Sequence, residues 1–336
     1  MFGKAAAEYI IKILSQGEKF YYVDKIFDIE KVYPVPRLIL LLPGKGCSWS
    51  KKTGGCYMCG FKSKLDKVND SYNYSSRDII ALCKLSLLMT KTQRCEKLYI
   101  YNGGSFFNEK EISLDAQYGI CKIIAQNPSI RELMVESRPE FITAGRFLVL
   151  KRVLGEKNLT VGIGLECQDD NIRNASVNKG FSRNDFNKAA DVILSYKGKL
   201  FVYVFLKPLY LSEREAIEEA VRTIQYSFEK GASIVSLSCA FIQENTKMAE
   251  EYERGNFRPP WLWSIMEVIR RAHDLGYVHI GSFEDEPPPI AVPYNCSKCS
   301  KEVMNILQEY NLTRDLKVFD QLSCTCKKEW EDIIRA

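Results

Sequence analysis

The sequence predicts an α/β fold in which parallel strands form a sheet with helices outside it. Three observations favour this class: short apolar runs alternate with amphipathic stretches, capping boxes open three of those stretches, and Gly or Pro ends many of them. Counted from Leu38, the alternation gives six βα units in series, as in a β/α barrel. Chemistry in such barrels sits on loops after the strand C-termini, so functional residues are expected there.

The expected strands are short and rich in β-branched, aromatic and other apolar residues. They cover residues 38–42, 97–102, 132–136, 159–166, 199–207, 234–239 and 277–283. The stretches between them predict helices that begin at a cap or a proline and end near glycine or proline. These helices cover residues 75–89, 115–127, 143–154, 182–196, 212–230 and 259–275.

The composition is that of an ordinary globular protein, with 46% hydrophobic and 26% charged residues among 336. No stretch reaches the roughly 18 apolar residues of a membrane span, and residues 1–14 predict an amphipathic helix rather than a secretion signal. We expect a cytoplasmic protein with no membrane partner, whose 12 cysteines are mostly metal ligands or buried thiols. The net charge of +5 is compatible with an RNA partner but does not require one.

Cys47, Cys56 and Cys59 follow the first expected strand at the spacing C-x8-C-x2-C. Pro43 and Gly44 break the apolar run, so the three thiols are expected on a loop at a strand C-terminus. A 4Fe–4S cluster is usually held by four thiolates, and three would leave one iron open for another ligand. The alternative is a zinc site that lacks its fourth ligand.

Residues 44–49 (GKGCSW) and 54–61 (GGCYMCGF) resemble the radical S-adenosylmethionine (SAM) superfamily. The usual spacing there is C-x3-C-x2-C, and the longer first gap is similar to the branch containing the Elongator catalytic subunit. The flanking residues resemble still more closely the archaeal radical SAM family that completes archaeosine in tRNA. The resemblance implies a partial (β/α)6 radical SAM barrel over residues 37–286. A short N-terminal helical segment (1–36) would precede it, and a small cysteine-rich C-terminal extension (287–336) would follow.

The resemblance also implies cofactors. Cys47, Cys56 and Cys59 would hold a 4Fe–4S cluster whose open iron chelates the methionine part of SAM. Reduction of the cluster by an electron donor would cleave SAM to a 5′-deoxyadenosyl radical. Gly103, Gly104 and Ser105 look like the superfamily's Gly-Gly-Glu segment, which binds the amino group of that methionine. Ser105 replaces the glutamate, which puts a carboxylate contact in doubt; a plain Gly-Gly turn is the alternative.

Three further residues at strand ends are implicated by the same resemblance. Glu136 begins Glu-Ser-Arg-Pro, which resembles the Glu-Thr-Arg-Pro segment of the Elongator-like branch, and is expected near SAM. A surface ion pair is the alternative for it. Glu166 would contact the ribose region of SAM, and Lys179 would pair with the SAM carboxylate. For Lys179 the alternative is an exposed lysine in a loop.

The C-terminal extension carries Cys296, Cys299, Cys324 and Cys326 as C-x2-C followed by C-x-C. Four thiolates fit a closed tetrahedral zinc site, which we predict here. An auxiliary iron–sulfur cluster and free thiols are the alternatives. The gap between the two pairs contains an expected helix over residues 301–310, which needs a staple in so short a tail.

By resemblance, the substrate is archaeal tRNA whose 7-deazaguanine base at position 15 carries a lysine joined through its side-chain nitrogen. Cleavage of the lysine carbon–nitrogen bond would make the chain a lyase that yields archaeosine. The implied partner is the transglycosylase-like lysine transferase that makes this intermediate. One alternative is a radical SAM enzyme, Elongator-like or methylthiolating, that acts on another tRNA nucleoside. Another is a non-catalytic, zinc-stapled RNA-binding protein.

Overall fold

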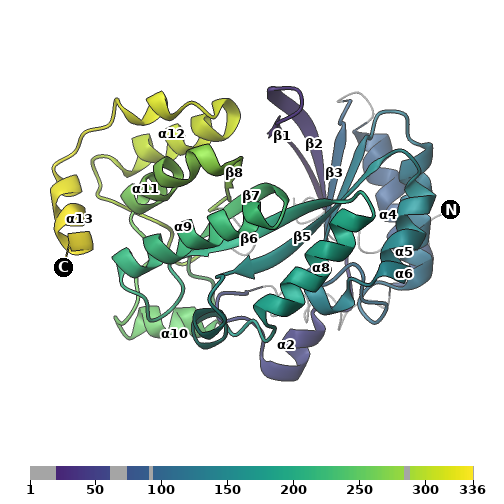
Figure 1. The fold of residues 1–336 in the computed structure, drawn as a ribbon, viewed down its shortest axis with the longest axis horizontal. Coiled ribbons are helices and arrows are strands. Elements are labelled where there is room, and N and C mark those ends of the chain that lie inside the picture. The colour runs from purple at the N-terminus through teal and green to yellow at the C-terminus, as the bar shows by residue number, and fades with distance from the viewer. Residues whose placement is uncertain (1–19, 61–73, 91–93, 284–287, 336) are drawn as a thin grey trace.

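The computed structural model describes residues 20–60, 74–90, 94–283 and 288–335 (Figure 1). The described strands form a sheet of eight in sequence order, in which β1 and β2 are antiparallel and every later neighbouring pair is parallel. The sheet curls into a half-barrel and helices cover its outer face (Figure 1). The predicted α/β class and the parallel order of the strands are confirmed.

Strands of a parallel sheet are buried on both faces, which explains why they were recognisable as nearly continuous apolar runs. In β3, for example, Leu98, Tyr99 and Ile100 are fully buried. The strands are β1 (Tyr21–Asp28), β2 (Tyr33–Leu41), β3 (Lys97–Tyr101), β4 (Glu132–Glu136), β5 (Asn158–Glu166), β6 (Lys199–Leu206), β7 (Ala232–Cys239) and β8 (Val278–Ile280).

The helices begin close to where the sequence predicts. Ser75, Ser182 and Ser212 each form a capping box with the acidic residue three positions later, so the orphan backbone N–H groups at the helix start find acceptors. The helices between the strands include α4 (Ser76–Met89), α5 (Leu114–Gln126), α6 (Ala144–Leu154), α8 (Arg183–Ser195), α9 (Glu213–Glu229) and α11 (Leu262–Ala272).

The concave side of the sheet carries a partly polar layer. Side chains alternate across a strand, so Tyr99 points away from the main core that Leu98 and Ile100 form with the helices. The Arg37 guanidinium lies 4.8 Å from the Tyr99 ring centroid and donates through Nε to Asp24 at 2.8 Å. The interior of the half-barrel is therefore filled by side chains below its C-terminal rim.

The N-terminal segment differs from expectation. The helix expected in residues 1–14 lies outside the described residues. Residues 21–28, expected within a helical segment separate from the barrel, form strand β1, which pairs with β2 from Tyr21 opposite Leu40 to Asp28 opposite Tyr33. β2 itself begins at Tyr33, before the expected boundary at residue 37. The physical reason is that residues 21–28 gain backbone hydrogen bonds and burial by pairing with β2, and their Tyr, Val, Ile and Phe side chains are compatible with such a half-buried edge strand.

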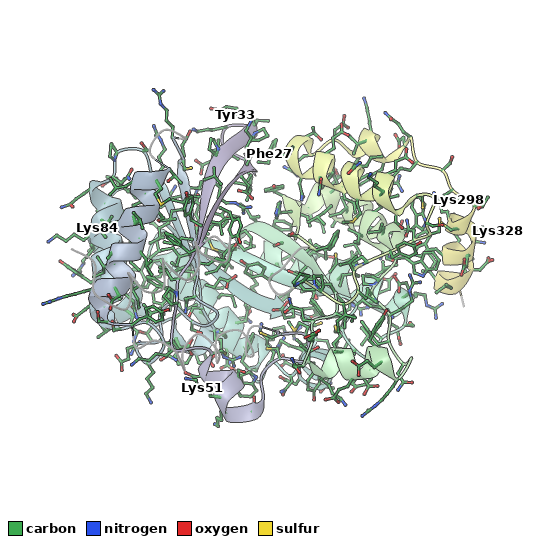
Figure 2. The ribbon with its side chains drawn as sticks, turned by 180° about the vertical axis from the view of Figure 1, so that it is seen from behind. Phe27, Tyr33, Lys51, Lys84, Lys298 and Lys328 are labelled. Carbon is green, nitrogen blue, oxygen red and sulfur yellow. The ribbon has the colours of Figure 1, made fainter. Side chains whose placement is uncertain are left out.

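The C-terminal extension packs on the barrel. Its helix α12 (Ser300–Thr313) includes the expected 301–310 helix and contacts β1, β2 and β8. A further helix, α13 (Cys326–Arg335), was not predicted. Figure 2 shows Lys298 and Lys328 at the outer end of this extension, far from Lys51 on the loop after β2. Among the helices of the described residues, none is long and apolar enough to cross a membrane.

Candidate cofactor site and tail metal site

The three cysteines predicted to hold a cluster lie on one loop beyond the C-terminal end of β2. Cys47 immediately precedes the short helix α2 (Ser48–Thr53), and Cys56 and Cys59 follow it. The backbone N–H of Cys59 donates to the carbonyl of Cys56 at 3.0 Å, so these two residues share one tight turn. All three residues are partly buried.

A π-helical turn after β5, η3 (Arg173–Val177), anchors this loop. The backbone N–H of Tyr57 donates to the last carbonyl of η3 at 3.0 Å. Trp49 Nε1 donates to the carbonyl of Asn178 at 2.8 Å, and Asn178 Nδ2 donates to the carbonyl of Gly55 at 2.8 Å. Single-turn π segments are common at functional sites, and this one joins the loop after β2 to the segment after β5.

The donor set of this loop fits an iron–sulfur cluster better than a single metal ion. Thiolates are the usual ligands of iron–sulfur clusters. Among the described residues, one group of possible metal ligands has all its donor atoms within 4.8 Å of one another, and that group is the four tail cysteines. A closed zinc site takes four ligands, and this loop offers three thiols. Burial raises the pKa of the Cys56 thiol, and the nearby Lys179 and Arg138 oppose that shift.

The loop after β3 lies directly against the cysteine loop. A side chain on Gly104 would collide with the Glu111 carboxylate and would lie 3.4 Å from the Cα of Cys47. Gly103 has a φ of 62°, in the left-handed region that favours glycine. The structure therefore places the Gly103-Gly104-Ser105 segment beside the first cysteine.

The buried carboxylate of Glu111 joins these two loops and was missed in the sequence. It accepts from the backbone N–H of Ser48 at 2.9 Å, from the backbone N–H of Ser105, and from Asn108 Nδ2 at 2.7 Å. The carbonyl of Glu111 accepts from the backbone N–H of Lys45 at 3.2 Å. No sequence signal reveals this role, because Ser48 lies 63 residues away.

Glu166 and Lys179 form a buried ion pair at the end of β5, with Nζ 2.6 Å from Oε1. Although burial by itself lowers the pKa of Lys179, the adjacent Glu166 carboxylate raises it above its ordinary range. Glu166 has a φ of 64°, which is strained for a residue other than glycine and is typical of functional sites. Gly164 leaves room for the pair, since a side chain there would collide with both partners. Lys179 is thus a buried ion-pair partner, and the alternative of an exposed loop lysine is wrong.

Glu136 lies at the end of β4, beside Tyr203 of β6. Burial raises the pKa of the Glu136 carboxyl from 4.5 to about 7, although Tyr203 and Lys179 favour the ionised form. An added Cβ on Gly162 would lie 3.1 Å from the Tyr203 ring and 3.5 Å from Cγ of Glu136, so glycine is needed for this close packing. Glu136 is consequently a partly buried acid, and the alternative of a surface ion pair is wrong.

Arg138 connects all these segments, although the sequence suggested no specific role for it. Its backbone N–H donates to Ser105 Oγ at 3.1 Å, and its Nη1 donates to the carbonyl of Lys179 at 2.9 Å. Its guanidinium lies 4.7 Å from the Trp49 ring centroid and also pairs with Glu140. The ends of β2, β3, β4 and β5 therefore converge on one site.

Asn102, the residue after β3, supplies a further sign of a polar ligand at this rim. Both its amide nitrogen and its amide oxygen are buried without a hydrogen-bond partner. An unsatisfied buried polar group costs about 1–3 kcal/mol. A bound polar molecule at this strand end would remove that cost, so the residues present fit a cofactor such as SAM.

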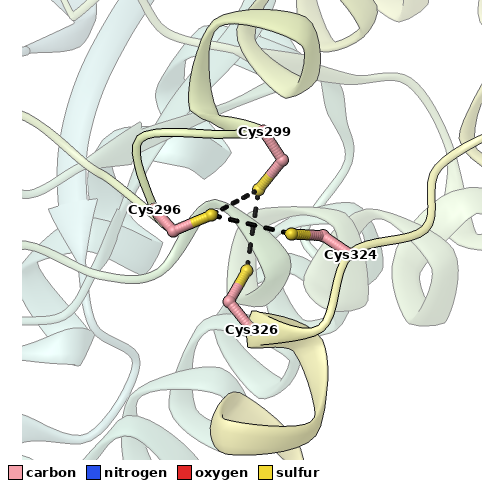
Figure 3. A group of neighbouring side chains, drawn as sticks. All are labelled: Cys296, Cys299, Cys324 and Cys326. Atoms are coloured by element: carbon pink, nitrogen blue, oxygen red, sulfur yellow. Dashed lines mark hydrogen bonds between the residues drawn. The ribbon is translucent and has the colours of Figure 1, made fainter.

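The side chains of the four tail cysteines point toward one another, and their sulfur atoms all lie within 4.8 Å of one another (Figure 3). The sulfur of Cys296 lies 3.5 Å from that of Cys299 and 3.6 Å from that of Cys324, and the sulfurs of Cys299 and Cys326 are 3.6 Å apart. Four thiolates about 2.3 Å from one zinc ion would be roughly 3.8 Å apart. Backbone N–H groups lower the pKa of Cys296 to about 6. The quartet can therefore hold one metal ion.

No family model matches the chain. The archaeosine synthase subunit beta of Methanosarcina acetivorans is 33% identical to it over 306 residues, which cover 88% of this chain and 84% of that protein. This chain belongs to the archaeosine synthase subunit beta family. A second relative of that name, from Thermococcus kodakarensis, is 28% identical over 304 residues, with 90% of this chain and 92% of that protein covered.

Among solved structures, the chain resembles Elp3 of the archaeon Methanocaldococcus infernus with an N-terminal deletion. The TM-score is 0.53 at 15% identity, and the match covers 82% of this chain and 63% of that one. The chain thus spans less than two thirds of that structure, and the likeness shows the fold alone. The partial β/α barrel expected from the sequence is confirmed.

We predict that Glu111→Gln weakens the contact between the loops after β2 and β3. An amide nitrogen cannot accept a hydrogen bond, so one backbone N–H of Ser48 or Ser105 loses its acceptor. The free energy of unfolding should fall by about 2 kcal/mol, as measured by denaturant titration. Glu109→Gln, at an exposed position nearby, is the control and should change stability little. Equal stability of the two variants would contradict the role of Glu111.

We predict that Glu136 makes stability depend on pH. Its raised pKa means that the folded protein keeps the proton to about pH 7, whereas the unfolded chain releases it near pH 4.5. The free energy of unfolding should therefore fall between these pH values, by about 3 kcal/mol. Glu136→Gln should remove this decrease, and exposed Glu156→Gln should retain it. The assignment would be contradicted if the free energy of unfolding of the wild type had the same pH dependence over this window as that of Glu136→Gln.

We predict that Cys299→Ser removes the tail metal and leaves the other site intact. Zinc content should fall while iron content stays constant, because the two cysteine groups are separated by the whole barrel sequence. The free energy of unfolding should fall by about 4 kcal/mol, since a structural metal is lost. Elemental analysis after anaerobic purification is the measurement, with exposed Ser297→Ala as control. Iron lost from a protein that never held zinc would indicate an auxiliary cluster instead.

Proposed function

We propose that this chain is a radical SAM enzyme that completes archaeosine in archaeal tRNA. The observation that carries the proposal is the 33% identity to an archaeosine synthase subunit beta over 88% of the chain. The loop with Cys47, Cys56 and Cys59 at the barrel's C-terminal rim agrees with it, because three thiols can hold a 4Fe–4S cluster with one open iron.

The proposed cofactor residues come from four adjacent strand ends. Cys47, Cys56 and Cys59 would hold the cluster after β2, and Gly103, Gly104 and Ser105 would hold the SAM methionine after β3. When bound and reduced, this cofactor pair supplies a 5′-deoxyadenosyl radical. The chain's own contribution is to place SAM and substrate within reach of each other and to exclude water.

The remaining polar residues of the site would orient SAM. Glu136 and Glu166 are carboxylates at consecutive strand ends, and hydroxyl groups of a ribose are suitable donors to them. Lys179 carries a buried positive charge that suits the SAM carboxylate, although it is already paired with Glu166. The SAM carboxylate would therefore either replace Glu166 as the partner of Lys179 or bind Lys179 together with Glu166.

The proposed substrate is tRNA bearing the lysine-modified 7-deazaguanine base at position 15. Removal of a hydrogen atom from the lysine carbon next to the side-chain nitrogen would permit cleavage of that carbon–nitrogen bond and leave the formamidine of archaeosine. The proposed activity is therefore that of a lyase. Its partners would be the transglycosylase-like lysine transferase and an electron donor, and the word subunit in the relatives' name supports a complex.

We also propose zinc as the ion of the tail quartet. The sulfur–sulfur distances of 3.5 and 3.6 Å are close to those of a tetrahedral Zn–S4 site. Four thiolates also complete a closed site, which is typical of structural rather than catalytic zinc.

We predict that the reduced protein forms archaeosine only from tRNA with the lysine-modified base. The assay combines anaerobic incubation with SAM and a reductant, digestion of the tRNA, and mass spectrometry of its nucleosides. Cys56→Ala, which removes one proposed cluster ligand, should abolish both iron binding and SAM cleavage, and rising salt should weaken tRNA binding.

Unmodified tRNA is the control in this assay. If the lysine-bearing nucleoside persists while 5′-deoxyadenosine accumulates equally with both tRNAs, the proposed substrate is wrong. The proposed radical SAM activity would still be supported by that result. If Cys56→Ala retains iron and still cleaves SAM, the assignment of Cys56 as a cluster ligand is wrong.

A further inference from the structure

The tail metal site lies where two helices of the C-terminal extension begin. Cys299 precedes α12 and Cys326 is the first residue of α13. Each helix then makes its own contact with the barrel: α13 contacts α9 and α11, and α12 contacts β8, β1 and β2. We infer that the metal-bound tail is a clamp that holds the β6–β8 side of the half-barrel in place, in addition to any role in the tail itself.

The first contact of the clamp is a buried hydrogen-bond chain from α13 to the start of α9. Trp330, one turn after Cys326, donates from Nε1 to Ser264 Oγ at 2.8 Å. Ser264 Oγ donates to Glu213 Oε1 at 2.6 Å, and the same oxygen accepts from the backbone N–H of Trp261 at 2.9 Å. Trp330, Ser264, Glu213 and Trp261 are all at most 5% exposed, so bulk water does not compete for these bonds.

This chain ends at the C-terminal rim of the barrel. Glu213 Oε2 lies 3.8 Å from Nζ of Lys207, the residue immediately after β6. Lys207 also donates to the carbonyl of Leu211 at 2.7 Å, which closes the loop between β6 and α9. Its φ of 69° is strained, as is that of Glu166 at the end of the neighbouring strand. Glu166 and Lys207 thus lie at adjacent strand ends, and both have an unfavourable backbone conformation. Such a conformation persists only where contacts with neighbouring residues stabilise it.

The second contact is made by α12 at the open edge of the sheet. β8 is the last strand, and the side-chain amide of Asn311 takes the place of a further strand. Its Nδ2 donates to the carbonyl of Ile280, and its Oδ1 accepts from the backbone N–H of Ile280, both at 2.8 Å. Arg314 donates to the carbonyl of Gly276 at 3.0 Å, and its guanidinium lies 5.1 Å from the Tyr277 ring centroid.

Arg314 also reaches the opposite edge of the half-barrel. Its guanidinium lies 5.9 Å from the ring centroid of Phe27 in β1, and the rings of Phe27 and Tyr277 are 5.7 Å apart. The C-terminal end of α12 therefore lies where the first and last strands approach each other. A half-barrel has no ladder of hydrogen bonds across this gap, so its width depends on what packs there.

The clamp lies next to the candidate cofactor site. Its hydrogen bonds and ring contacts are made at β8, β1 and the loop after β6. The cysteine loop borders this region, because Cys56, Tyr57 and Met58 pack against a cluster that includes Leu209 of the loop after β6. The inference concerns the geometry of the barrel and holds whether or not the proposed substrate is correct. It predicts that loss of the clamp loosens the loop after β6 and strand β8.

The test is hydrogen–deuterium exchange on the full chain with its metals bound. Trp330→Phe removes the N–H donor to Ser264 and keeps an aromatic ring in the core. We expect the amides of residues 207–212, more than 100 residues away in sequence, to exchange about tenfold faster. The control is Lys328→Ala on the exposed face of the same helix, which should leave exchange unchanged. Faster exchange confined to residues 295–335 would overturn the inference.

Two further measurements test the same inference if Trp330→Phe does not fold. Ser264→Ala breaks the same chain from the α11 side, and should speed exchange over residues 207–212 with the tail metal retained. Removal of the tail metal from the wild type with a chelator should speed exchange at β8 as well, with iron still bound at the first site. Unchanged exchange at both places after metal removal would show that the metal holds only the tail.

Discussion

The buried carboxylate of Glu111 is the contact on which the candidate cofactor site depends. It accepts backbone N–H groups from Ser48 on the cysteine loop and Ser105 on the loop after β3, while Asn108 supports one of its oxygens. Two loops that follow different strands are thereby fixed at one spacing. Hydrogen bonds to a buried charged group are among the stronger ones. The close approach of the two loops also requires glycine at position 104, where a side chain would collide with the Glu111 carboxylate.

Much of the fold could be predicted because its signals are local. The serine caps, the apolar runs and the prolines that end them lie within a few residues of the structure they specify, as at Ser75, Ser182 and Ser212. Strand β1 was missed because its burial depends on pairing with β2 rather than on its own pattern. Helix α13 was missed for a related reason: its single fully buried residue, Trp330, finds its partner on α11.

The same distinction applies to the site. The thiols of Cys47, Cys56 and Cys59 could be predicted because metal ligands at short spacing are visible in the sequence, and their role remains a prediction. Glu111 and Arg138 could not, because each acts through partners that the sequence separates. Arg138 contacts Trp49 and Lys179 from a third strand end, and only the curled order of the strands brings these residues together.

An open half-barrel has a weakness that a closed barrel lacks. The gap between its first and last strands lacks the hydrogen bonds that would fix the width of the gap. Here the extension packs at this gap through Asn311 and Arg314, and a metal ion held by the four cysteines would join its two helices at the other end. A short tail has little apolar core of its own, so such an ion would supply stability that the tail lacks.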